Sequence, residues 1–93
     1  MQNKLYEERA AAFFEEGTTQ ETLFTGLAAE VGEVLSERVK ETRKGEERTA
    51  EILDELSDVL WYVNTIAVSR GYTLSALMEY NIMNSMKNIF FNY

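Results

Sequence analysis

The sequence predicts an all-α protein that folds as an antiparallel bundle of about four helices. Apolar residues recur at helical spacing along the chain, and no segment shows the strict alternation of a half-buried strand. The chain contains no proline, and Gly17, Gly45 and Gly71 each end one of the periodic stretches. Glycine is favoured just past a helix C-terminus, so these residues are expected to separate the helices. With 93 residues and no linker or repeat, we expect one domain over residues 1–93.

The first two helices are expected over about residues 2–16 and 19–44. The inner stripe of the first consists of Leu5, Ala12 and Phe13. Thr18 and Glu21 have the spacing of a capping box, which favours a helix start at this point. Basic residues gather in the last turns of the second helix, where they suit the negative end of its dipole.

The last two helices are expected over about residues 50–70 and 74–90, with Thr49 and Thr73 as their N-caps. A short connection joins the second helix to the third, so these two should lie antiparallel. The third helix is apolar around most of its circumference, which indicates burial on several sides. Because so short a chain hides little surface, we expect homo-oligomerisation to complete the bundle. Trp61 should lie in that interface; the alternative is that it packs under the first helix of its own chain.

The composition excludes several functions. The chain has 16 acidic and 9 basic residues, a formal charge of −7, and no cysteine or histidine. A thiol nucleophile, a Ser-His-Asp triad and a zinc site of imidazole or thiolate ligands are therefore ruled out. The acidic balance argues against nucleic acid as a partner. No apolar run approaches the roughly 20 residues that cross a bilayer, and no secretory signal is visible. We therefore expect no membrane association and a cytoplasmic location.

Acidic residues at helical spacing are the main candidates for chemistry. Glu30 and Glu33 are neighbours on the second helix, and Glu55 and Asp58 on the third, because residues three apart share a helix face. Further like-charge neighbours occur at a spacing of four residues: Glu33 with Glu37, Glu51 with Glu55, and Asp54 with Asp58. Such pairs destabilise a helix, so a positive charge should come from outside.

A hard cation is the expected ligand of these carboxylates. Oxygen ligands without nitrogen or sulfur suit Mg²⁺ or Mn²⁺ in octahedral coordination, and facing antiparallel helices commonly build inward-pointing acidic sites. The alternative is an acidic surface that keeps a small protein soluble.

Basic and amide side chains form a second set of candidates. Five of the nine bases are Arg38, Lys40, Arg43, Lys44 and Arg48. The ordinary interpretation is a solvated turn that complements the helix dipole, and the functional one is contact with a polyanion held by metal ions. Amides and a lone base in the last helix are usually surface residues, but here they are candidates for reaching phosphate, ribose or base: Asn81, Asn84 and Lys87.

The acidic motifs resemble those of the MazG-like all-α nucleoside triphosphate pyrophosphohydrolases. The signature of that family is E-x-x-E, a spacer, and then E-x-x-D. Here Glu30-x-x-Glu33 is followed, after twenty-one residues, by Glu55-x-x-Asp58. The neighbouring segments also fit the family's pattern: GLAA before the first motif and DELSDVLWY across the second. The resemblance extends over about residues 18–88.

The resemblance implies a fold, an activity and a set of roles. Family members hydrolyse a nucleoside triphosphate (NTP or dNTP) between the α and β phosphates, giving a monophosphate and pyrophosphate, and they assemble as dimers or tetramers. The implied Mg²⁺ ligands are Glu30, Glu33, Glu55 and Asp58. The implied substrate contacts match the family's polar positions only loosely: Lys40, Asn81, Asn84 and Lys87. The chain departs from the family at residues 89–91, where relatives often carry an arginine, and at Ser57, where glycine is common.

In the expected mechanism, Glu33 or Glu37 orients the attacking water or accepts its proton. Lys40 and Lys87 offset the charge that develops on the leaving pyrophosphate. Tyr62, one turn from Asp58, either donates a hydrogen bond to phosphate or serves packing alone. The alternative to an enzyme is an oligomeric helical protein that binds a nucleotide or a structural cation without catalysis.

Overall fold

The computed structural model describes residues 2–11 and 18–90, with side chains described for 2–10 and 18–85. This part of the chain forms four helices and no strand, which confirms the all-α class. The helices are α1 (Asn3–Ala11), α2 (Gln20–Lys44), α3 (Thr49–Ser69) and α4 (Leu74–Phe90). The predicted positions Ala12, Phe13 and Gly17 lie outside the described residues. None of the described helices is long and apolar enough to cross a membrane.

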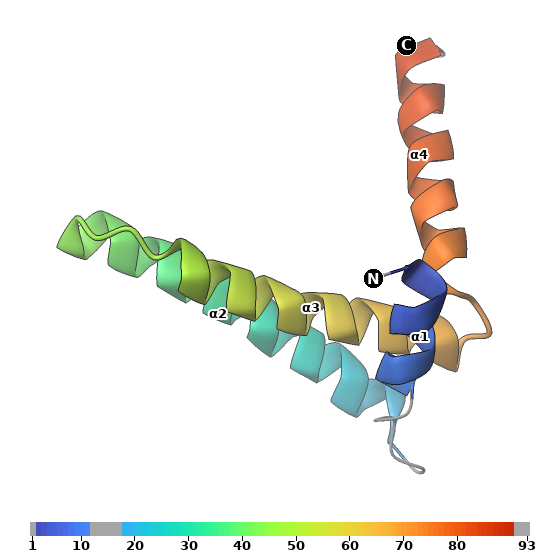
Figure 1. Ribbon diagram of the computed structural model, residues 1–93, viewed down its shortest axis with the longest axis horizontal. Coiled ribbons are helices and arrows are strands. Elements are labelled where there is room, and N and C mark those ends of the chain that lie inside the picture. The colour runs from blue at the N-terminus through green and yellow to red at the C-terminus, as the bar shows by residue number, and fades with distance from the viewer. Residues whose placement is uncertain (1, 12–17, 91–93) are drawn as a thin grey trace.

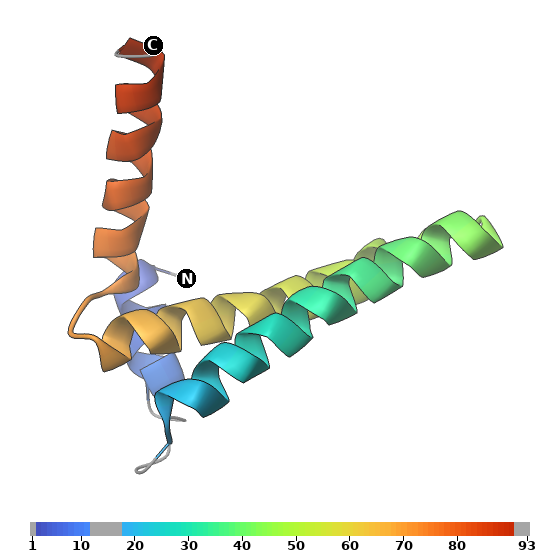
Figure 2. The same cartoon turned by 180° about the vertical axis from the view of Figure 1, so that it is seen from behind.

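Helices α2 and α3 form a long antiparallel hairpin, as their short connection predicts, and they lie side by side in both views (Figure 1, Figure 2). Gly45 ends α2 with φ at 64°, and its N–H donates to the carbonyl of Glu41 at 2.9 Å. At the other end of the hairpin, Gln20 Nε2 donates to Ser69 Oγ at 3.0 Å and Gln20 Oε1 accepts from Arg70 Nε at 3.1 Å. Polar contacts therefore fasten α2 to the far end of α3.

The N-caps of α2 and α3 differ from the expected ones. Thr19, not Thr18, caps α2, and its Oγ1 accepts the N–H of Thr22 at 3.2 Å. Arg48, not Thr49, occupies the N-cap of α3 and makes no side-chain cap bond. Glu47 Oε1 instead accepts the N–H of Thr49 at 2.8 Å. Hydrogen bonds to the side chain and the backbone of Thr49 hold the pKa of Glu47 below its ordinary value. Several adjacent side chains can satisfy the free N–H groups of a helix start, so spacing alone does not select one.

The turn between α3 and α4 redirects the chain. Gly71 has φ at 84°, and its N–H donates to the carbonyl of Val68 at 3.0 Å. The N–H of Tyr72 reaches the carbonyl of Ala67 at 2.9 Å, which completes the Schellman pattern of a helix end. Thr73 then caps α4, as expected. After this turn α4 leads steeply away from the hairpin (Figure 1).

Helix α1 lies against the base of α4. Glu7 Oε1 accepts from the backbone N–H of Ser75 at 2.7 Å and from its hydroxyl at 3.2 Å. Thr73 Oγ1 accepts the N–H of Ala76 at 3.0 Å. A carboxylate and a hydroxyl thus satisfy the free N–H groups at the start of α4, where a negative charge is also favoured by the helix dipole.

One chain does not close the expected four-helix bundle. Among the described residues, the backbone of α4 lies close to α1 and α3 but not to α2, and the molecule measures 44 × 42 × 28 Å. Its accessible surface is 7204 Å², whereas a compact chain of 10.7 kDa exposes about 5,500 Å². The buried apolar side chains among the described residues are few: Ala10, Leu23 and Leu74. Local periodicity predicts that α4 is a helix, but not the direction in which the turn at Gly71 sends it.

Candidate functional site

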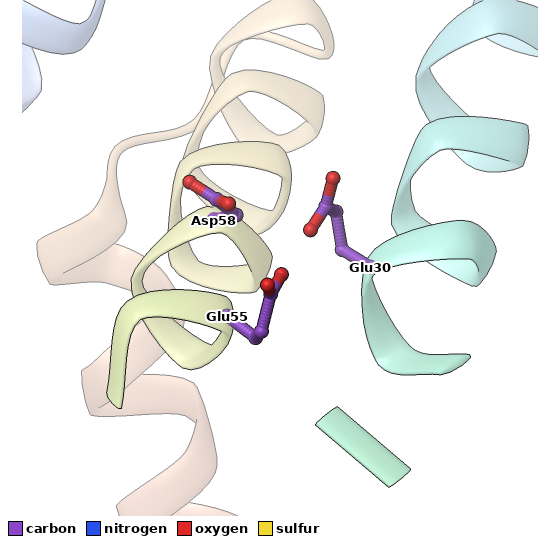
Figure 3. Close-up of side chains that lie close together, drawn as sticks. All are labelled: Glu30, Glu55 and Asp58. Atoms are coloured by element: carbon purple, nitrogen blue, oxygen red, sulfur yellow. The ribbon is translucent and has the colours of Figure 1, made fainter. Parts of the chain in front are cut away.

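The hairpin brings three of the four predicted metal ligands together. Glu30 projects from α2 toward Glu55 and Asp58 on α3 (Figure 3). One carboxylate oxygen from each of these residues lies within 4.8 Å of the other two. Glu30 and Glu55 are half-buried and Asp58 is exposed. The three residues, called the acidic cluster below, meet because their helical spacing and the antiparallel pairing of α2 with α3 place them on facing sides.

Among the described side chains, no basic residue neutralises the acidic cluster. In the part of the chain that the structure describes, no lysine or arginine forms an ion pair with its members. Burial raises the pKa of Glu55, and the hydrogen bond and negative charge of Glu30 raise it further. The charges of Glu33 and Asp58 act in the same direction. A site in which convergent carboxylates disfavour the ionisation of Glu55 is suited to a divalent cation, which would offset the negative charge.

Glu33 lies near the acidic cluster without belonging to the group of three. Its charge acts on Glu55, and its own side chain is exposed. Glu33 is thus a fourth carboxylate that acts electrostatically on the cluster, and it is open to solvent.

Glu37 is in a different electrostatic environment. Only 6% of the residue is exposed, and its carboxylate accepts from Arg48 Nε at 2.6 Å and from Lys40 Nζ at 3.1 Å. These bonds, with that of Arg48 the stronger influence, lower the pKa of Glu37, and the pKa of Arg48 is raised in turn. Glu41 accepts the backbone N–H of Arg48 at 2.7 Å and pairs with Arg38 at 3.0 Å. Three of the five bases singled out in the sequence, Arg38, Lys40 and Arg48, therefore neutralise acids near the hairpin turn.

Tyr62 packs against Gly26 in the interface between α2 and α3. A Cβ placed on Gly26 would overlap the Tyr62 ring, whose Oη would lie only 2.6 Å away. The ring also meets Trp61 edge to face, with centroids 5.1 Å apart and planes at 88°. One signal of this contact is visible in the sequence, a glycine inside a helix one turn before Glu30. The residue that this glycine contacts depends on the distance between the helices.

The predicted contacts of the last helix lie away from the acidic cluster. Asn81 and Asn84 are exposed on α4 and line a groove of about 510 Å³ with residues of α3 and α4. Among the described residues the backbone of α4 does not approach that of α2, the helix that carries Glu30. The side chain of Lys87 lies outside the described ones.

An all-α chain with a carboxylate cluster between paired helices belongs to the class of helical proteins with a candidate site for a hard metal ion. Comparison with known families identifies the particular family. Residues 18–84 match the MazG nucleotide pyrophosphohydrolase domain, so the chain belongs to this family and a nucleotide is its expected class of substrate. The family uses divalent metals, and the acidic cluster is the candidate site in this chain. No curated protein and no solved structure matched the chain.

Proposed function

We propose that the protein is a Mg²⁺-dependent pyrophosphohydrolase that cleaves a nucleoside triphosphate between its α and β phosphates. The products would be the nucleoside monophosphate and pyrophosphate, from either ribo- or deoxyribonucleotides. The observation that carries the proposal is the convergence of Glu30, Glu55 and Asp58 with no neutralising base among the side chains that the structure describes. Membership in the family supports the reaction class.

The acidic cluster and Glu33 would hold Mg²⁺ or Mn²⁺. When bound, the cation neutralises charge on the phosphates and activates water. Glu33 is the better candidate for orienting that water and accepting its proton, because it is exposed beside the cluster. Glu37 is the weaker one, because Lys40 and Arg48 already occupy its oxygens. Tyr62, one turn from Asp58, remains a candidate for a hydrogen bond to phosphate.

The substrate contacts from α4 require a second copy of the chain in this proposal. Asn81 and Asn84 do not reach the acidic cluster of their own chain, since α4 leads away from α2 (Figure 2). In a homodimer or homotetramer, α4 of one copy would bring these amides and Lys87 to the site of another. The accessible surface exceeds that of a compact chain by an area larger than the roughly 800 Å² per partner that a standard interface buries.

The test is an assay that separates the two phosphate products. The protein is incubated with Mg²⁺ and each NTP or dNTP in turn, and pyrophosphate and orthophosphate are measured separately. Pyrophosphate release is expected and should be lost in Asp58→Asn and Glu33→Gln, with helical circular dichroism unchanged. Glu21→Gln, an exposed carboxylate in the first turn of α2, is the matched control.

Two results would contradict the proposal. Orthophosphate alone would move cleavage to the terminal phosphate. Thermal stabilisation by nucleotide and Mg²⁺ without any product would indicate a binding protein, because a ligand of the native state raises its stability.

A further inference from the structure

Gly26 and Tyr62 each lie about one helical turn from a member of the acidic cluster. Gly26 precedes Glu30 by four residues in α2, and Tyr62 follows Asp58 by four residues in α3. Because the helices run antiparallel, both steps lead the same way along the hairpin, by about 6 Å. The contact between Gly26 and Tyr62 is therefore the next layer of the helix interface after the pair Glu30 and Asp58.

In this layer the space between residue 26 and the Tyr62 ring is too small for a side chain on Gly26. A methyl group there would overlap the end of the Tyr62 ring, so either the ring or one helix would have to shift. The ring is half-buried and is flanked by the edge-to-face contact with Trp61, which restricts where it can move. Gly32, the other glycine inside α2, has nothing within 4 Å of a Cβ. The close approach is thus specific to one of the two helix-internal glycines.

We propose that Gly26 is a positioning residue: its missing side chain lets the Tyr62 ring set the separation of α2 and α3 at which Glu30 meets Glu55 and Asp58. The proposal rests on the metal-binding role proposed for the acidic cluster. Carboxylates on two helices converge on one ion only at a narrow range of separations, because metal–oxygen distances are short. A wider hairpin would leave each carboxylate in place on its helix and still weaken the site.

Manganese binding by the metal-free full chain, without nucleotide, tests the proposal. The loss of the free Mn²⁺ signal in electron paramagnetic resonance reports the affinity. Gly26→Ala is expected to weaken Mn²⁺ binding roughly tenfold, as changes beside metal ligands commonly do. Gly32→Ala makes the same substitution in the same helix, closer to the acids in sequence, and should stay within about twofold of the unmodified protein.

A double variant assigns the effect to the ring. In Tyr62→Leu the space beside residue 26 is open, so adding Gly26→Ala there should change the Mn²⁺ affinity by less than about twofold. Trp61 is the only tryptophan and touches the ring, so its near-ultraviolet circular dichroism should change in Gly26→Ala and not in Gly32→Ala. If Gly26→Ala does not fold, the double variant should recover both helical circular dichroism and Mn²⁺ binding.

Several results would overturn the proposal. They are equal Mn²⁺ affinities for Gly26→Ala and Gly32→Ala, an undiminished loss in the Tyr62→Leu background, or no Mn²⁺ binding by the unmodified chain. Glycine-dependent Mn²⁺ binding without pyrophosphate release from any nucleotide would instead overturn the proposed function and leave the positioning role intact.

Discussion

Two glutamates on facing helices show that the pKa of an acidic residue depends on its neighbours in the folded chain. Glu37 is buried between Arg48 and Lys40, which lower its pKa, whereas burial and like charges raise the pKa of Glu55. In the sequence both are members of like-charge pairs at helical spacing. The difference arises across the hairpin, because Arg48 reaches back to α2 while none of the described bases pairs with the acidic cluster. Charge patterning could therefore predict the cluster, but not which acids are already neutralised.

The ion pair of Glu37 predicts how stability depends on pH. Its pKa is lower in the folded chain than in the unfolded one, so its contribution is full above the ordinary glutamate pKa and is lost as pH falls through the lowered value. Glu37→Gln should lower the thermal midpoint at neutral pH and flatten its acid dependence. Thermal unfolding followed by circular dichroism from neutral pH to pH 3 measures both. Equal acid dependence of the variant and the unmodified chain would contradict this role.

Glu55 predicts the opposite response to loss of charge. In metal-free buffer at neutral pH, Glu55→Gln should raise the thermal midpoint, because an ionised carboxylate beside three others is relieved. In Mg²⁺ the order should reverse, since the unmodified cluster gains a ligand that the variant binds weakly. Glu79→Gln on α4 is the control and should respond equally in both buffers. A lower midpoint for Glu55→Gln in both buffers would contradict the unpaired state of the cluster.

At the scale of elements, the C-terminal ends of α2 and α3 were well predicted, whereas the contacts between helices were not. Gly45 and Gly71 end α2 and α3 in left-handed conformations, and Thr73 caps α4, as the sequence indicates. These signals act within a few residues, which is why they can be read locally. The contact of Gly26 with Tyr62 and the direction of α4 depend on how helices pack, which no local signal encodes.

The turn at Gly71 gives a prediction at this scale. A side chain at φ of 84° is strained, so Gly71→Ala should destabilise the fold by about 1–2 kcal/mol. Gly32→Ala is the matched control, because alanine in an open helix position stabilises by about 0.5–1 kcal/mol. Urea unfolding of both variants measures the two free energies. Equal stability of both variants would show that the turn tolerates a side chain.

At the scale of the whole molecule, the apolar surface left by one chain predicts assembly. Exposed apolar residues remain on the three longer helices, among them Leu35, Leu53 and Ile82. Light scattering should give a mass that is a multiple of the 10.7 kDa chain. Ile82→Glu should reduce this mass, whereas Glu8→Lys, at an exposed position of α1, should not. A monomeric mass for the unmodified protein at micromolar concentration would contradict the assembly, and with it the proposed route of α4 to the site.

The scarcity of buried apolar side chains has a consequence for handling the protein. If the chains share their core, folding and association form one equilibrium, and the folded fraction depends on how much protein is present. Dilution would then act as a denaturant, and the melting temperature would rise with concentration. An assay run at nanomolar protein would measure a population of separated chains. In these chains α4 has no second copy whose site it could complete.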